Sequence, residues 1–265
     1  MPGRGQSTWW TVKDKRLKEK QDMKHNNQAM LGIVLAASLL QFAVFAEDNN
    51  ASTQKPPPSK LPNVLIIGDS ISMGYTDGVR KLLEGKANVS RPPCNCAYSG
   101  NGVNNVQSWL GTTKWDVVHF NFGIWNTHCL YRGKLVLDRS KYKPEDLKRR
   151  YTTEQHVENL SKIVAVLKKT GAKLIWASTT PFVSYGEDTK LLVVKNNKAA
   201  KELMDKQGIT VNDLYSLALP HLKEWQSADG CHFATYEPLA KQVATTVADA
   251  LGRQSKELRP AAESN

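Results

Sequence analysis

The sequence lacks the features that usually indicate a nucleic-acid-binding protein. Its formal net charge is +11, yet it has no internal repeat and no cluster of basic residues interleaved with aromatics. Proteins that bind nucleic acid usually show such a cluster. The densest basic stretch, 141–150, is interrupted by Pro144, Glu145 and Asp146. We therefore interpret this stretch as a solvated face and expect no nucleic-acid partner.

Cysteine is also scarce, with four residues in the chain, Cys94, Cys96, Cys129 and Cys231. Their spacing is looser than the paired spacing of most zinc sites, so we expect no metal site. The alternative metal ligands beside these cysteines are His119, His128 and His232. Cys94 and Cys96 are too close in sequence to pair easily with each other, which favours a disulfide from one of them to Cys129, although sequence does not determine the connectivity.

No apolar run is long enough for a comfortable membrane span, which needs about 20 residues. The longest run, 30–46, contains Gln41 and ends in small residues typical of a signal-peptidase site. We therefore expect a signal peptide cleaved after Ala46 and a secreted or periplasmic protein. A single-pass anchor is the alternative, and the long polar stretch before this run makes Met23 a candidate for the true start.

Composition divides the chain into four segments. We expect a leader over 1–46, a flexible linker with three consecutive prolines over 47–61, a folded domain over 62–252 and a polar tail over 253–265. Without the leader, the chain keeps 29 Lys and Arg against 22 Asp and Glu, a net charge of +7. The sequence leaves the oligomeric state open.

Within the expected domain, short apolar or β-branched segments alternate with helical ones. Thr152 and Gln155 resemble a capping box ahead of apolar residues at helical spacing, and Gly171 supplies the stop of this helix. Such alternation predicts an α/β protein with a mostly parallel sheet and helices on both faces. The expected strands are 64–67, 115–122, 174–178 and 209–212, and the other expected helices are 194–206 and 235 or 236 to about 251.

The stretch 126–151 has no clear periodicity and is long for a loop, so we interpret it as a lid or substrate-binding insertion. Aromatic residues near the predicted strand ends, Trp125, Tyr131 and Tyr185, are suited to stacking on a sugar.

Ser70 follows the apolar segment 64–67 through Gly68 and Asp69. Ligands of open α/β sheets bind at the carboxyl ends of strands, so Ser70 is expected where chemistry occurs. Taken alone, Ser70 would also fit a helix N-cap, because a helix is expected to begin near Thr76 or Asp77.

A second pattern, Asp229-Gly230-Cys231-His232, lies far downstream. Its spacing lets the carboxylate hold the imidazole while the other ring nitrogen faces a serine. We therefore expect Ser70 as nucleophile, His232 as general base and Asp229 as the orienting acid, with Asp213 as the alternative acid. The other histidines are expected to be structural, namely His119, His128, His156 and His221.

These two patterns resemble the Gly-Asp-Ser and Asp-x-x-His blocks of the SGNH (GDSL-type) hydrolases, and the resemblance covers about 62–251. It implies a flavodoxin-like three-layer sandwich and a serine esterase that needs no cofactor. Longer stretches resemble a secreted bacterial subgroup of this family, namely 114–123, 171–177 and 211–215.

The resemblance also implies an oxyanion hole built from the backbone N–H groups of Ser70 and Gly102. Trp125 stands where the family has its oxyanion asparagine, so the Asn126 amide, or after it the Trp125 indole, is expected to replace that donor. Asp69 is expected to fix the turn before Ser70 through its side chain and to lie at the substrate-binding site. Trp125 and Tyr131 are expected to contact the substrate.

The function expected from these patterns is hydrolysis of a small acyl ester, especially an acetyl group on carbohydrate. Two alternatives remain open: a non-catalytic carbohydrate-binding protein that keeps the fold, and a lipase or lysophospholipase. An apolar acyl groove would favour the lipase alternative.

Overall fold

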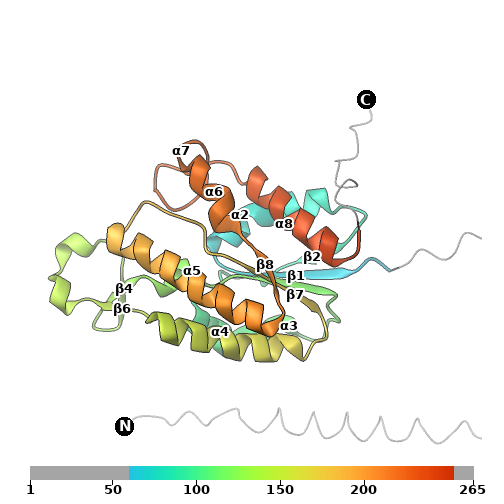
Figure 1. Ribbon diagram of the computed structural model, residues 1–265, viewed down its shortest axis with the longest axis horizontal. Coiled ribbons are helices and arrows are strands. Elements are labelled where there is room, and N and C mark those ends of the chain that lie inside the picture. Colours follow the sequence, from blue (N-terminus) through green and yellow to red (C-terminus); the bar gives the residue numbers. More distant parts are fainter. Residues whose placement is uncertain (1–59, 254–265) are drawn as a thin grey trace, which may run out of the picture. The chain divides into compact units, whose positions relative to one another are not determined.

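The computed structural model describes residues 60–253 (Figure 1). The predicted leader, the cleavage site after Ala46, most of the predicted linker and nearly all of the predicted tail lie outside the described residues. Within the described part, no helix combines the length and the apolar character needed to cross a membrane.

The centre of the structure is a sheet of five parallel strands in the order β2-β1-β3-β7-β8. In the inner strands the side chains alternate between two buried faces, as in β1, where Val64 and Ile66 join one core cluster while Leu65 and Ile67 join the other. Burial on both faces explains the continuous apolar runs. The strands are β1 (Asn63–Ile67), β2 (Asn88–Ser90), β3 (Val117–Phe120), β7 (Lys173–Ala177) and β8 (Thr210–Asn212).

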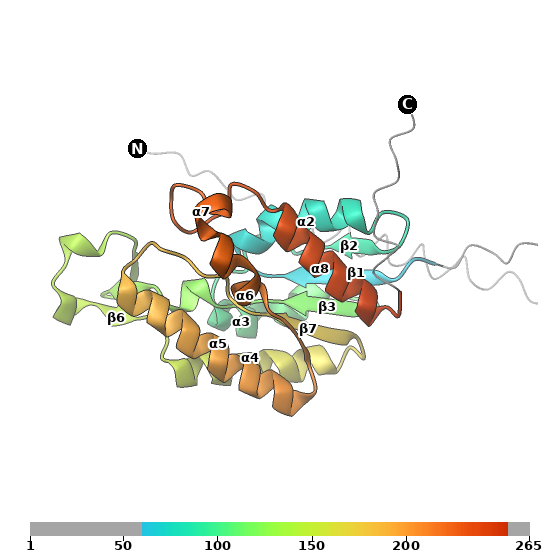
Figure 2. The same ribbon diagram turned by 45° about the horizontal axis from the view of Figure 1, so that its top comes forward.

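Helices cover both faces of this sheet (Figures 1 and 2). The helices α2 (Ser70–Leu82) and α8 (Glu237–Ala250) pack on one face, where Tyr75 and Val243 belong to the same core cluster. The other face carries α3 (Ser99–Leu110), α4 (Thr153–Lys168) and α5 (Glu187–Gln207). The expected three-layer α/β architecture is therefore confirmed.

Several boundaries differ from those expected. The helix after β1 begins at Ser70 itself, one residue after its N-cap Asp69, and not near Thr76. The helix α5 begins at Glu187, where Gly186 makes a turn at φ +86° and two acidic residues occupy the first turn. The capping box of Thr152 and Gln155 is formed as expected. The strand β2 and the helix α3 were not expected. For β2 the reason is that it has three residues and no buried side chain.

The insertion after β3 is folded. It contains a small antiparallel sheet in the order β5-β4-β6, which is drawn to the side of the main sheet in Figure 1. Arg139 and Arg149 both bind Asp188 at the start of α5, and these ion pairs tie the insertion to the main body. Its elements are η1 (Ile124–Asn126), β4 (Cys129–Tyr131), β5 (Lys134–Val136), η2 (Arg139–Lys141), η3 (Pro144–Asp146) and β6 (Lys148–Arg149).

The chain between β8 and α8 contains α6 (Leu214–Ala218), η4 (Leu219–His221) and α7 (Leu222–Trp225). All four cysteines are free, and the expected disulfide to Cys129 is therefore wrong. Within residues 60–253, no three His, Cys, Asp or Glu side chains lie close enough together to hold a metal ion.

Candidate active site

Three side chains distant in sequence form one hydrogen-bonded chain. The Ser70 hydroxyl donates to Nε2 of His232 at 2.9 Å, and Nδ1 of His232 donates to Oδ2 of Asp229 at 2.6 Å. Because an ionised carboxylate only accepts, the ring carries its hydrogen on Nδ1 and leaves Nε2 free to take the serine proton. The structure thus brings together the three residues expected to form a catalytic triad.

Asp229 is itself held in place by its neighbours. Its Oδ1 accepts from the backbone N–H groups of Cys231 and His232, both at 2.9 Å, and from the Ser227 hydroxyl at 2.7 Å. The hydrogen bond from His232, followed by those from Ser227 and Cys231, holds the pKa of this carboxyl well below its usual range. Asp229 is therefore ionised at neutral pH and can hold the imidazole in one tautomer.

Asp213, the alternative acid, is occupied elsewhere. It caps α6, where Oδ1 accepts from the Ser216 N–H and the Ser178 hydroxyl, and Oδ2 accepts from the Ser216 hydroxyl. This network joins the end of β7 to α6. Asp213 is therefore a structural cap, and Asp229 is the carboxylate that contacts the histidine.

Solved structures share this architecture. A lipase/acylhydrolase from Enterococcus faecalis is 19% identical, covers 76% of this chain and 99% of its own, and aligns with a TM-score of 0.58. A lipolytic protein of the G-D-S-L family from Veillonella parvula is 15% identical and covers 70% of this chain and 96% of its own, with a TM-score of 0.52. The chain has the SGNH (GDSL-type) hydrolase fold.

A third structure with the SGNH fold is a catalytic mutant of an acetylxylan esterase from Geobacillus stearothermophilus. It is 14% identical and covers 73% of this chain and 95% of its own, with a TM-score of 0.56. No family model and no curated protein matches the sequence. At these identities the likeness establishes the fold, and the chemistry must be derived from the geometry of the site.

Within the SGNH fold, Ser70 occupies the first turn of α2, directly after its cap. Asp69 accepts the Ile71 N–H at 3.0 Å through its side chain, while the Ser70 N–H has no hydrogen-bond partner in the described part of the chain. First-turn N–H groups have no partner inside a helix. The Ser70 N–H is therefore free to donate to an oxyanion.

Gly102 does not fit its expected role as a second oxyanion donor. It lies inside the first turn of α3, and its N–H donates to the Tyr98 carbonyl at 3.2 Å. A Cβ at this position would lie 2.6 Å from the Phe122 ring and 2.7 Å from Ile163, so glycine is required here by close packing.

Asn126 is likewise not a free donor. It is fully buried, its Oδ1 accepts the N–H and hydroxyl of Ser99, and its Nδ2 donates to Nδ1 of His156 at 2.7 Å. Burial lowers the pKa of His156 to about 4, so the ring stays neutral and can accept. Asn126 therefore fastens η1 to α3 and α4, and the expectation that it completes the oxyanion hole is wrong.

Trp125 is half-buried and packs against the cluster of Ile124 and Phe182, which also includes Cys231 of the catalytic loop. Its ring stacks on His128 with 5.3 Å between centroids. The indole N–H has no hydrogen-bond partner within residues 60–253. Of the two side chains expected to replace the family asparagine, only the Trp125 indole remains available.

Beside Asp229 lies an open cavity of about 680 Å³. Its wall includes Leu137, Arg139, Ser140, Ser184 and Tyr185. Tyr185 has a φ of +70°, which is rare for a residue with a side chain, and its carbonyl is held by Arg139 at 2.9 Å and Thr189 at 2.8 Å. Residues held in such rare backbone conformations often occur at functional sites.

Tyr131, which was expected to contact substrate, is not among the residues lining this cavity. It lies in β4, where its ring packs against Tyr142 at 4.8 Å and under Arg132 at 5.2 Å. Tyr185 provides the aromatic wall instead. Tyr185 is one of the aromatic residues that the sequence suggested for sugar stacking. Its place beside the catalytic loop could not be predicted, because only the fold brings the turn at Tyr185-Gly186 next to Asp229.

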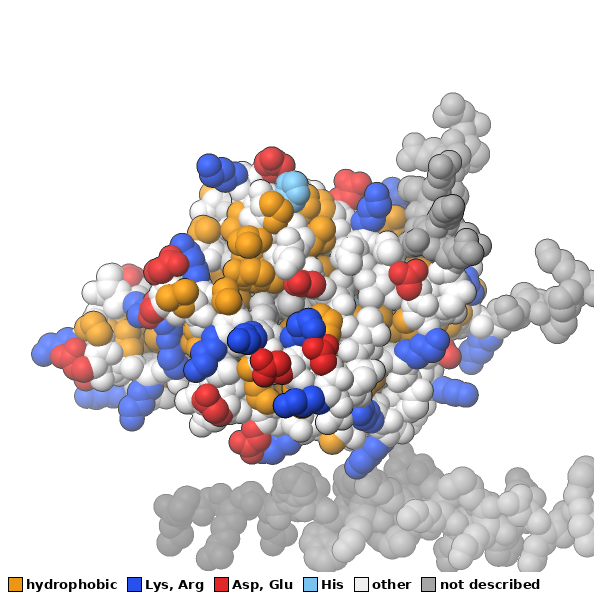
Figure 3. Space-filling model, in the orientation of Figure 1, with side chains coloured by type: hydrophobic (Ala, Val, Ile, Leu, Met, Phe, Trp, Pro, Cys, Tyr) orange, Lys and Arg blue, Asp and Glu red, His pale blue; other side chains and the backbone are white. Residues whose placement is uncertain are grey.

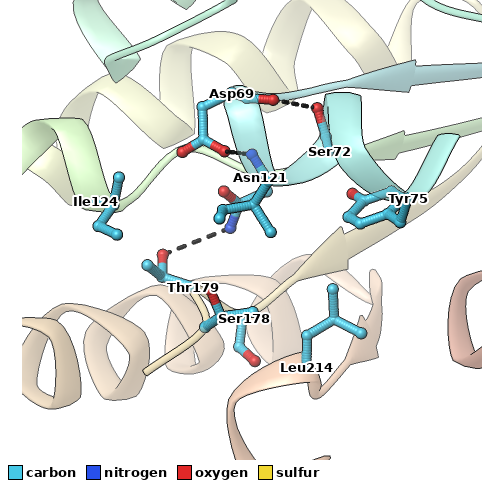
Figure 4. A pocket seen from close by; sticks show the side chains of 10 residues that line it. Asp69, Ser72, Tyr75, Asn121, Ile124, Ser178, Thr179 and Leu214 are labelled. Atoms are coloured by element: carbon cyan, nitrogen blue, oxygen red, sulfur yellow. Dashed lines mark hydrogen bonds between the residues drawn. The ribbon is translucent and has the colours of Figure 1, made fainter. Parts of the chain in front are cut away.

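Asp69 faces inward, toward a small cavity of about 10 Å³ with room for about one water molecule (Figure 4). It is 2% exposed, so direct contact with substrate does not fit, whereas its capping bond fixes the nucleophile turn as expected. Burial raises its pKa from 3.8 to about 6, against the lowering effects of the Ile71 N–H, His232 and Arg91.

This buried carboxyl predicts a specific pH dependence of stability. Between about pH 4 and 6 the folded chain keeps a proton on Asp69 that the unfolded chain releases, so the free energy of unfolding falls as pH rises through this window. Asp69→Asn keeps the capping oxygen and removes the ionisation. We expect the variant to gain up to about 3 kcal/mol relative to wild type between pH 4 and pH 7.

Urea unfolding of both proteins at several pH values measures this difference. His119 and His156, whose pKa values burial lowers to about 4, destabilise the fold as pH falls, but they act equally in both proteins and cancel. Parallel stability curves for the two proteins would contradict the prediction.

Proposed function

We propose that the chain is an exported serine esterase that removes acetyl groups from carbohydrate. The observation that carries the proposal is the continuous hydrogen-bonded chain from Ser70 through His232 to Asp229. Export is supported by the signal-peptide pattern that ends at Ala46.

In the proposed reaction, the Ser70 oxygen attacks the ester carbonyl carbon and its proton passes to Nε2 of His232. The resulting oxyanion is stabilised by the Ser70 N–H. Collapse breaks the bond to the alcohol, which leaves with the proton from His232. Water then attacks the acyl-enzyme and gives a proton to Nε2. When the bond between Ser70 and the acyl carbon breaks, His232 returns this proton to the Ser70 oxygen and the carboxylic acid leaves.

The carbohydrate part of the proposal is supported by the cavity beside Asp229. Its volume of about 680 Å³ lies within the range of ligand sites, and its wall mixes Tyr185 with charged and hydroxyl groups such as Arg139 and Ser140. Sugars suit such a wall, because they offer hydroxyls for hydrogen bonding and apolar faces for stacking. The solved acetylxylan esterase of the same fold adds support for an acetyl group.

A second candidate, hydrolysis of esters with longer acyl chains, is favoured by an apolar groove of about 210 Å³. Its wall includes Phe182, Val193 and Leu222. At Val183 it adjoins the catalytic loop, because the Val183 N–H donates to the Gly230 carbonyl at 2.8 Å. Figure 3 shows apolar side chains gathered around α6, close to this groove, and Leu219 there is 48% exposed.

A panel of chromogenic esters with acyl chains of two to twelve carbons, beside acetylated xylan, separates these candidates. We expect acetate to be the best acyl group and acetate to be released from xylan, because a polar cavity of about 680 Å³ lies beside Asp229. A maximum at eight or more carbons would favour the lipase-like candidate.

A fluorophosphonate reagent provides an independent check, because it reacts covalently with activated serines. We expect mass spectrometry to place the adduct on Ser70. A folded protein with no adduct and no turnover of any ester would instead favour the carbohydrate-binding alternative.

A further inference from the structure

Arg150 is held in a fixed position at the end of the insertion. Its backbone N–H donates to the His128 carbonyl at 2.9 Å, and its Nε donates to the Trp125 carbonyl at 3.0 Å. Its guanidinium carbon lies 4.2 Å from the centroid of the Tyr98 ring, within cation–π distance. The side chain is therefore fixed by one hydrogen bond and one aromatic face.

The positive charge of Arg150 is not neutralised within the described part of the chain. Arg139 and Arg149, in the same insertion, both bind Asp188, which Arg139 contacts with two nitrogens at 2.9 Å each. Arg150, in contrast, has no acidic partner among residues 60–253, and its two terminal nitrogens have no hydrogen-bond partner there. A half-buried guanidinium of this kind offers a pair of donors that matches a carboxylate.

A row of three rings, Trp125, His128 and Tyr185, leads from the backbone carbonyl that Arg150 binds to the cavity beside Asp229. Trp125, whose carbonyl holds Arg150, stacks on His128, and His128 lies 5.0 Å from the Tyr185 ring. Tyr185 lines the cavity that also contains Asp229. Burial lowers the pKa of His128, as do Arg150 and Arg149, so this ring is neutral and adds no positive charge. The cavity wall also carries Asp138, and its Arg139 is paired with Asp188, whereas Arg150, which is not part of that wall, keeps an unpaired charge at the Trp125 end of the row.

We propose that Arg150 binds a carboxylate on the alcohol portion of the ester, so that the preferred substrates are acetylated acidic saccharides. The inference rests on the proposed esterase function and adds the charge of the saccharide to it. In this arrangement the sugar ring lies against Trp125 or Tyr185, while its carboxylate accepts from the two terminal nitrogens of Arg150.

Two small acetylated sugars test this inference directly. The probes are a singly acetylated methyl glucoside and the matching methyl glucuronoside, which differ only in a hydroxymethyl or a carboxylate at C6. For wild type we expect kcat/KM to be about tenfold higher for the glucuronoside, mainly through KM, since a hydrogen bond to a charged group contributes about 1.5 kcal/mol or more. Raising the ionic strength should reduce this preference.

Three variants test whether Arg150 causes the preference for the glucuronoside. Arg150→Gln should bring the ratio of the two kcat/KM values close to one, and Arg150→Lys should keep part of it, because an ammonium retains the charge without the paired donors. The matched control is Arg132→Gln, which removes an exposed arginine from above Tyr131 in the same insertion and should leave the ratio as in wild type.

Equal kcat/KM values in wild type would overturn the inference, as would a preference that survives Arg150→Gln. The wild-type ratio needs no variant, so it decides the matter even if Arg150→Gln does not fold. If Ser70-dependent acetate release is seen from both sugars at equal rates, only this inference fails. If neither sugar is deacetylated, the carbohydrate part of the proposed function fails with it.

Discussion

Ser70→Ala is expected to reduce kcat for acetate ester hydrolysis by about 10⁴-fold or more. The variant lacks the oxygen that forms the acyl-enzyme, and in serine hydrolases of this mechanism loss of the nucleophile removes nearly all of the triad's contribution. The fold should not change, because the Ser70 side chain is half-buried and, among residues 60–253, bonds only to His232. Steady-state kinetics and thermal unfolding of the two proteins measure both effects.

Ser72→Ala is the matched control for this prediction. Ser72 lies in the same turn of α2, but its hydroxyl donates to the Asp69 carbonyl at 2.7 Å and does not contact His232. We expect it to cost about 1 kcal/mol of stability and to change kcat by less than tenfold. If Ser70→Ala retained more than about a tenth of wild-type turnover, Ser70 would not be the nucleophile and the proposed function would lose its basis.

Four of the five strands of the central sheet could be predicted, because strands buried on both faces show continuous apolar runs. The capping box at Thr152 and Gln155 likewise uses short-range contacts, and the structure contains it. The strand β2 escaped prediction because its three residues sit at the edge of the sheet with exposed side chains at both ends. Strands are recognised in a sequence by the apolar residues that they bury, and β2 buries none.

The hydrogen-bonded triad of Ser70, His232 and Asp229 could be predicted, because the nucleophile follows a strand and the acid and base are three residues apart. The oxyanion residues could not, because Gly102 and Asn126 differ from free donors only through their tertiary partners. A glycine required by packing against Phe122 looks the same in sequence as one that approaches substrate. Arg150 was missed for the same reason, since only the fold places it over Tyr98.

The second large effect concerns the orienting acid. Asp229→Asn should keep an acceptor for the Cys231 and His232 N–H groups, so the loop should retain its conformation. The amide NH₂, however, would then face Nδ1 of His232 and donate to it. The ring would have to carry its hydrogen on Nε2, where it can no longer accept the Ser70 proton. We expect kcat to fall by about 10⁴-fold, the effect of the wrong tautomer in a triad.

Asp213→Asn is the control that separates this role from that of a cap. The new side chain keeps an acceptor for the Ser178 hydroxyl and the Ser216 N–H, and it does not touch His232. We expect a small loss of stability and kcat within a few-fold of wild type. The pair discriminates sharply, because both aspartates follow strands or loops near the site and only one contacts the imidazole. A large loss of kcat in Asp213→Asn, with Asp229→Asn near wild type, would assign the orienting role to Asp213 and contradict the geometry described above.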